Sequence, residues 1–345
     1  MNAPLLTVTN LRVGLNTSRG PADALRGVSF SVQRGETVGL IGESGCGKSM
    51  TALAVMGLLP PTARVSGSIQ FDSQELVGAD EDALCALRGD RIGMIFQEPM
   101  TALNPLHTVG AQVAEPLRQH RGMGRNESRA EALRLLERVH LPQAAQRLDA
   151  YPHQLSGGQR QRVMIAAALA CGPDLLIADE PTTALDATIQ GEILELLAEL
   201  VKDSQMALLL ISHDLGVMAK SVQRVMVMYG GTVVESGPTA SVFERLAHPY
   251  TRGLFGARPR LGATSFNGVK PRLMTIGGRV PELVDLPVGC GFADRCERVE
   301  SACREAMPSS ITVAAEHDVR CLKPHGPFPF QGEGWDGGEN VKVGL

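Results

Sequence analysis

The sequence has 345 residues, of which 43% are hydrophobic and 20% are charged, with a net charge of −4. These values are ordinary for a soluble globular protein, and the length suits one large domain with an appendage. The slight negative charge, without any dense basic stretch, argues against nucleic acid or an anionic membrane surface as the main partner.

The sequence shows neither a membrane-spanning segment nor an export signal. No run approaches the roughly 18 to 20 apolar residues of a membrane-spanning helix. Met1 to Pro4 lack the basic and apolar segments of an export signal. We therefore expect a cytoplasmic chain that reaches a membrane only through partners.

The first part of the chain is predicted to be β-rich. Residues 5–13 and 24–32 read as strands separated by a Gly-Pro turn. Residues 36–41 form a short apolar strand that runs into a glycine-rich loop, with a helix from Lys48. Residues 91–96 predict another strand.

The middle of the chain alternates between helix and strand. A mixed-polarity helical region, 108–147, is followed by a glycine turn and an Ala-rich helix. The elements predicted after it are strand 174–178, helix 188–202, strand 206–211, helix 215–220 and strand 224–228. This alternation predicts an α/β sheet with right-handed crossovers. Residues 256–345 are rich in Gly, Pro and Cys, which favours a small appended module over more sheet.

The glycine-rich loop matches G-x-x-x-x-G-K-[ST], the pattern of a phosphate-binding loop. Its glycines let backbone N–H groups surround an anion at the start of a helix. Lys48 is predicted to reach the β- and γ-phosphates of a nucleotide, and the Ser49 hydroxyl to hold Mg²⁺. An ordinary glycine turn is the alternative. The candidate ATP-binding residues here are Gly42, Glu43, Ser44, Gly45, Cys46, Gly47, Lys48, Ser49 and Met50.

Two carboxylates follow the apolar run 175–178. Asp179 fits the Mg²⁺-associated aspartate of P-loop NTPases. Glu180 is placed to orient an attacking water and accept its proton. The alternative is a pair of solvated acids at a strand end.

A second anion-seeking sequence, Ser156-Gly157-Gly158-Gln159, follows Leu155 and opens a helix. With this LSGGQ sequence, the region from about residue 5 to 250 resembles an ABC-type ATPase. The resemblance implies a P-loop α/β core whose mixed sheet includes an N-terminal antiparallel part, and a helical subdomain at about 98–172. It also implies that the signature of one subunit covers ATP held by another, with residues 1–255 forming the nucleotide-binding domain.

The same resemblance assigns further roles. Gln97 is implied to contact both the attacking water and Mg²⁺. Ser49 and Asp179 are the other two residues predicted to hold Mg²⁺. Asp186 resembles the D-loop residue at the dimer contact, and His213 resembles the switch histidine that hydrogen-bonds the γ-phosphate. Glu180 and His213 are the implied catalytic residues. One feature departs from the family: the region 13–17 contains Leu15 and no aromatic ring to stack on adenine.

Four of the seven cysteines crowd one segment, at positions Cys290, Cys296, Cys303 and Cys321. Their wide spacing suits an inorganic core held by four thiolates better than the usual zinc pairs. Residues 248–251 and 280–296 resemble the C-terminal extension of dipeptide/oligopeptide importer ATPases, which implies a [4Fe–4S] cluster on these cysteines. Zn²⁺ and four packed, reduced thiols are the alternatives. The extension is expected at 256–325, and the tail 326–345 has no interpretable motif.

Residues 96–105 resemble the D-type ATPase of these importers. This implies a heterodimer with an F-type ATPase, two transmembrane permease subunits and a substrate-binding protein, at the cytoplasmic face of the inner membrane. The implied function is ATP-driven import of dipeptides or oligopeptides, with nickel or glutathione as alternative cargo. A non-transport ABC ATPase and a nucleotide-binding regulator without turnover are the other candidates.

Overall fold

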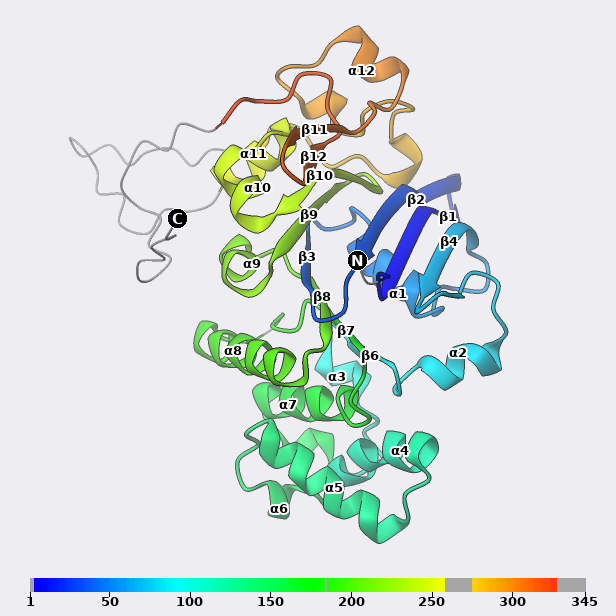
Figure 1. Cartoon of the computed structure of the whole chain (residues 1–345), viewed down its shortest axis with the longest axis vertical. Coiled ribbons are helices and arrows are strands. Elements are labelled where there is room, and N and C mark those ends of the chain that lie inside the picture. The colour runs from blue at the N-terminus through cyan, green and yellow to red at the C-terminus, as the bar shows by residue number, and fades with distance from the viewer. Residues whose placement is uncertain (1–2, 184, 258–274, 328–345) are drawn as a thin grey trace, which may run out of the picture.

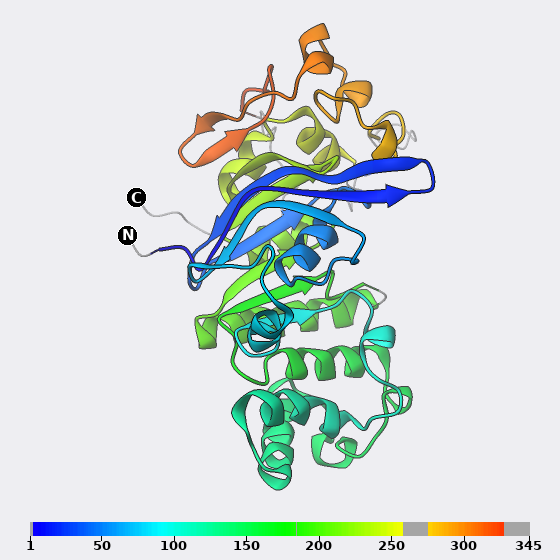
Figure 2. The same cartoon turned by 90° about the vertical axis from the view of Figure 1, so that its right-hand side faces the viewer.

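A computed structural model describes residues 3–183, 185–257 and 275–327. Within these residues the chain forms two sheets surrounded by helices (Figures 1 and 2). The tail from residue 328 onward, including Trp335, lies outside the described residues, as does Ala184 of the predicted D-loop.

The larger sheet has the strand order β11-β12-β10-β9-β3-β8-β7-β6. Its five parallel strands are β9 (Arg224–Tyr229), β3 (Thr37–Ile41), β8 (Ala207–Ile211), β7 (Leu175–Asp179) and β6 (Ile92–Ile95). The antiparallel edge consists of β10 (Thr232–Pro238), β12 (His317–Val319) and β11 (Ile311–Ala314). The carboxyl ends of the parallel strands therefore meet along one edge.

The smaller sheet is antiparallel, in the order β2-β1-β4-β5. Its strands are β1 (Leu6–Thr17), β2 (Gly20–Val32), β4 (Arg64–Phe71) and β5 (Gln74–Glu75). The first two are longer than the sequence predicts, because pairing continues to the tip of the hairpin, where Thr17 faces Gly20.

The helices fall into groups along the chain. Those of the core are α1 (Lys48–Val55), α2 (Glu81–Leu87), α8 (Ala187–Ser204), α9 (Leu215–Ser221), α10 (Thr239–Arg245) and α11 (Pro249–Gly256). The helical subdomain contains α3 (Pro99–Ala102), α4 (Val109–Arg121), α5 (Arg125–Arg138), α6 (Ala144–Arg147) and α7 (Gly157–Ala168). Of these, α4, α5 and α6 lie at the lower end of the molecule in Figure 1. The short α12 (Ser301–Glu305) lies near the opposite end. None of the described helices is long and apolar enough to cross a membrane.

Strand β7 shows how the core is divided. Its residues are buried on both faces, as expected for a parallel strand covered on each side. Leu176 and Ala178 face one hydrophobic cluster with the helical subdomain, α8 and α9. Leu175 and Ile177 face a second cluster with α1 and the antiparallel sheet. The large sheet is thus the central layer.

The C-terminal module corrects one expectation. The sequence favours an appendage without sheet, yet β11 and β12 form a hairpin that extends the large sheet next to β10. Each strand is only three or four residues long, too short for a clear alternating pattern. The hairpin is held by a buried contact that pairs His317 Nε2 with a Glu235 carboxylate oxygen at 2.8 Å.

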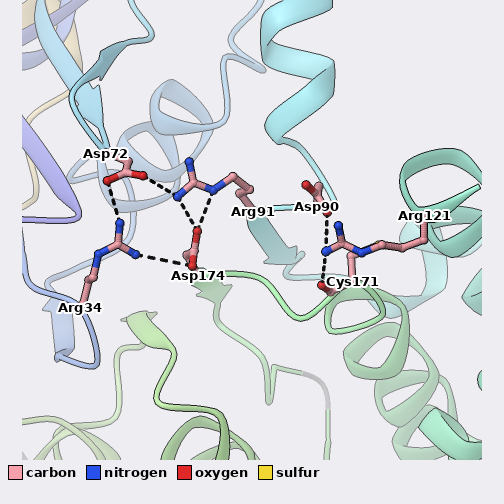
Figure 3. Close-up of polar contacts among 7 residues, drawn as sticks. All are labelled: Arg34, Asp72, Asp90, Arg91, Arg121, Cys171 and Asp174. Carbon is pink, nitrogen blue, oxygen red and sulfur yellow. Dashed lines mark hydrogen bonds and ion pairs between the residues drawn. The ribbon is translucent and has the colours of Figure 1, made fainter.

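An ion-pair network joins the two sheets to each other near the amino ends of the parallel strands (Figure 3). Arg91, before β6, donates to Asp174, before β7, and to Asp72, after β4, each at 2.7 Å. Arg34, before β3, donates to the same Asp72 at 2.7 Å. These guanidinium groups hold the pKa of Asp72 below its usual range. Nearby, Arg121 of α4 pairs with Asp90 at 2.8 Å, so the helical subdomain is tied to the same end of β6.

Candidate nucleotide site

The glycine-rich loop connects β3 to α1, as predicted. Gly42 has φ of 155°. A Cβ there would lie 2.3 Å from the Met228 carbonyl oxygen of β9 and 2.7 Å from Cys46 Sγ. Only glycine lets the loop leave β3 this close to its neighbour. The Cys46 side chain is buried against Gly42 inside the loop, and this burial raises the pKa of its thiol.

Lys48 folds back across the loop. Its ammonium donates to the carbonyl oxygens of Gly42 at 2.9 Å and Glu43 at 3.1 Å, and its side chain is buried. Gly47 caps the helix with φ of 107° and has no side chain to occupy the first N–H groups. Ser44 and Gly45, in the middle of the loop, are exposed to solvent. The arrangement places the Lys48 ammonium beside a helix start that has no side-chain cap, which is suited to a polyphosphate.

At the carboxyl end of β7, Asp179 is almost fully buried, and one carboxylate oxygen, Oδ1, has no hydrogen-bond partner in the described structure. Burial raises the pKa of Asp179, an effect that the Ser49 hydroxyl opposes. An unpaired buried carboxylate oxygen next to a hydroxyl fits an oxygen-liganded cation such as Mg²⁺.

Glu180 is the meeting point of three strand ends. Its Oε2 accepts a hydrogen bond from Gln97 Nε2 at 3.2 Å and lies 3.4 Å from His213 Nδ1. Gln97 follows β6, Glu180 follows β7 and His213 follows β8. The structure thus brings together three residues that the sequence singled out separately.

The backbone at Glu180 is unusual and helps to explain this convergence. Glu180 has φ of 46°, a left-handed conformation rare for a residue with a side chain. Its N–H donates to the Ile211 carbonyl of β8, and Thr183 Oγ1 donates to its Oε2 at 2.9 Å. Sequence reasoning missed Thr183, which nothing but its place three residues after Glu180 could have revealed.

The Ser156 to Gln159 segment lies away from the glycine loop, at the exposed start of α7. Ser156 Oγ accepts from the Gln159 N–H at 3.4 Å, and Gln159 Oε1 accepts from the Ser156 N–H at 3.1 Å, forming a capping box. A Cβ on Gly158 would lie 2.9 Å from Ile189 Cγ2, so glycine allows close packing against α8. Asp186 caps α8 by accepting from the Ile189 N–H at 3.0 Å.

Leu15, in the region where an adenine-stacking ring was sought, is half-buried against the second hydrophobic cluster. The guanidinium of Arg64 lies beside the neighbouring Gly14, since a Cβ on Gly14 would meet Arg64 Nη2 at 3.1 Å.

The four C-terminal cysteines line one small cavity together with His248 and Phe292. Burial raises the pKa of Cys290 and Cys296, and raises that of Cys321 to about 11. The Cys290 N–H donates to the Cys303 carbonyl of α12 at 2.7 Å, which joins two of the four cysteine segments. Within residues 3–183, 185–257 and 275–327, no group of three or more His, Cys, Asp or Glu side chains is arranged to hold a metal ion.

Comparisons with known proteins agree with this architecture. The family model described as ABC transporter matches residues 25–183, and the one described as oligopeptide/dipeptide transporter, C-terminal region, matches residues 234–303. The chain belongs to the ATP-binding subunits of ABC transporters and is an ABC-type ATPase. Within that family it carries the C-terminal region of oligopeptide/dipeptide transporters, which confirms the resemblance seen in the sequence.

Two relatives and one solved structure illustrate the match. The chain is 47% identical to the dipeptide transport ATP-binding protein DppD of Bacillus subtilis, over 92% of this chain and 94% of that protein. It is 46% identical to the oligopeptide transport ATP-binding protein OppD of Salmonella typhimurium, over 88% and 89%. The ATP-binding cassette MJ0796, in a dimeric post-hydrolysis state bound to ADP and Pi, matches with a TM-score of 0.62 at 32% identity, over 68% of this chain and 98% of that chain.

Proposed function

We propose that this ATPase drives the uptake of dipeptides or oligopeptides through a membrane transporter. The observation that carries the proposal is the combination of the Gln97–Glu180–His213 convergence with a C-terminal region of the oligopeptide/dipeptide transporter type. The names of the relatives DppD and OppD, which cover most of the chain, support peptides over nickel or glutathione as cargo.

In the proposed mechanism, the glycine loop and Lys48 bind the phosphates of ATP. Ser49, Asp179 and Gln97 would hold Mg²⁺, which supplies charge neutralisation at the phosphate oxygens. Glu180 orients the attacking water and takes its proton, and His213, whose Nδ1 lies 3.4 Å from Glu180 Oε2, would donate to the γ-phosphate. Ser156 and the helix start behind it would bind the ATP of a second ATPase subunit, with Asp186 at the contact.

The exposure of Ser156 and Gly157 at the start of α7 supports the proposed assembly with a second ATPase subunit. We place residues 1–255 in the nucleotide-binding domain, with its helical subdomain at about 98–172, and residues 256–325 in the importer extension. The partners would be an F-type ATPase subunit, two transmembrane permeases and a substrate-binding protein, with this chain at the cytoplasmic face of the inner membrane. The MJ0796 structure, which is dimeric, supports a two-subunit arrangement.

Uptake measurements test the cargo. Cells lacking this gene, complemented with the wild-type chain, should take up a labelled dipeptide faster than cells complemented with Glu180→Gln. Labelled Ni²⁺ and glutathione provide the two comparison arms. A complementation effect confined to nickel or glutathione, or absent from all three, would rule out peptide import as the function.

For the cysteine cavity we propose a [4Fe–4S] cluster on Cys290, Cys296, Cys303 and Cys321, with Zn²⁺ as the alternative. The support is that all four cysteines line one cavity. Anaerobically purified protein should absorb at about 400 nm and contain iron. Cys321→Ser should lose both signals, whereas Cys85→Ser, at an exposed cysteine of α2, should keep them. Protein that contains only zinc would exclude the cluster.

A further inference from the structure

Glu43, the second residue of the glycine loop, is bound by the C-terminal segment that carries the four cysteines, the cysteine module (described residues 275–327). Arg295 donates to both carboxylate oxygens of Glu43, from Nη1 at 2.6 Å and from Nη2 at 3.1 Å. The pair joins residues 252 positions apart in the sequence. Two parallel bonds between a guanidinium and a carboxylate fix the orientation of both groups.

Arg295 is itself held in a single orientation. Its Nε donates to the Gly277 carbonyl at 2.9 Å, and Nη1 also donates to Tyr229 Oη at 3.2 Å. The guanidinium lies over the rings of Tyr229 and Phe292, at 5.7 and 5.8 Å from their centroids. Only 5% of the side chain is exposed, so solvent competes little for these contacts.

The main chain of the same loop residue is held as well. The Glu43 N–H donates to Tyr250 Oη at 2.7 Å. Tyr250 belongs to α11, is fully buried, and meets the ring of Tyr229 edge-to-face at 4.7 Å. Residues outside the loop therefore restrain Glu43 through both its side chain and its backbone.

The module is in turn fastened to the core at a second place. Arg26 of β2 donates to the Pro287 carbonyl at 2.6 Å, just before Cys290. Arg19, near the tip of the β1–β2 hairpin, pairs with Glu282 and Asp285 at 2.7 Å. Because Arg295 directly precedes Cys296, the fold of the cysteine segment decides where its guanidinium lies.

We propose that Arg295 is a positioning residue for the phosphate-binding loop, through which the cysteine module sets the affinity for nucleotide. Arg295 fixes Glu43, and Glu43 fixes the turn that presents the loop N–H groups and the Lys48 ammonium. Without it the loop samples other conformations and binds phosphate more weakly, while the groups around Glu180 stay in place. The inference rests on the proposed nucleotide-binding role of the loop.

The test is a titration of the full chain with a fluorescent ATP analogue and Mg²⁺, together with steady-state hydrolysis. Arg295→Met and Glu43→Gln should each raise Kd and KM about tenfold, the scale of one charge-assisted hydrogen bond. We expect kcat to change less than about twofold. The double variant should be no weaker than the weaker single variant, because both act on one contact. Arg295→Lys, which keeps the charge but loses the paired geometry, should fall between wild type and Arg295→Met.

Arg304→Met is the matched control. Arg304 lies in the same module, next to Cys303, but pairs with Asp294 inside that module. Its Kd should equal that of wild type. An unchanged Kd in Arg295→Met, an equal loss in Arg304→Met, or additive losses in the double variant would overturn the inference. Lys48→Ala separates the nucleotide-binding role of the loop from the positioning role of Arg295. If Lys48→Ala also keeps wild-type affinity for nucleotide, the proposed role of the loop fails. If Lys48→Ala loses affinity and Arg295→Met does not, only the role of Arg295 is refuted.

Discussion

Glu180→Gln should stop steady-state ATP hydrolysis while leaving ATP binding intact. The amide can still accept from Gln97 and Thr183 through its oxygen, so the geometry around residue 180 is retained. It can no longer take a proton from water, and general-base contributions are typically about 100- to 10,000-fold. We expect kcat to fall by at least about 100-fold, with ATP trapping the protein in a stable dimer.

Phosphate release and size-exclusion chromatography in the presence of ATP measure these two effects. Glu199→Gln, the same change at an exposed position of α8, should behave as wild type. Wild-type hydrolysis by Glu180→Gln would remove Glu180 from the mechanism.

Gly42→Ala should greatly weaken the binding of ATP. The added methyl would lie 2.3 Å from the Met228 carbonyl oxygen, a backbone atom of β9 that the sheet holds in place, so the loop must move instead. Losing two hydrogen bonds from loop N–H groups to charged phosphates costs about 3 kcal/mol, or roughly 100-fold in Kd. Isothermal titration with ATP measures this loss directly.

Gly122→Ala provides the comparison. Gly122 caps α4 with φ of 63°, and a Cβ there would meet nothing within 4 Å. It should lose about 1 kcal/mol of stability from backbone strain alone while its Kd stays at the wild-type value. If Gly42→Ala binds ATP as well as Gly122→Ala does, the close approach of the loop to β9 is not required for phosphate binding.

The parallel core and the convergence at Glu180 were accessible from the sequence. Strands β3, β7 and β8 are continuous apolar runs, and each leads into a polar segment. Since parallel strands end at one edge, Gln97, Glu180 and His213 had to meet there. The position of the glycine loop followed from the same strand-loop-helix pattern.

Long-range contacts of single side chains were not accessible. No local pattern links Glu43 to Arg295 or Tyr250, because their partnership depends on how the cysteine module packs on the core. The hairpin of β11 and β12 was missed because its strands are too short to show periodicity. The capping box at Ser156 was predictable from Ser and Gln at the right spacing, but its proposed partner lies on another chain.

The adjacent residues Asp90 and Arg91 have a mechanical consequence. Asp90 forms an ion pair with Arg121 of the helical subdomain. Arg91 forms ion pairs with Asp72, next to the small sheet, and with Asp174, next to the large sheet (Figure 3). The contact of α4 with the chain therefore lies at the start of β6, where Arg91 also joins the two sheets. Gln97 follows the carboxyl end of the same strand and donates to Glu180, so β6 connects the helical subdomain to the residue proposed to orient the attacking water.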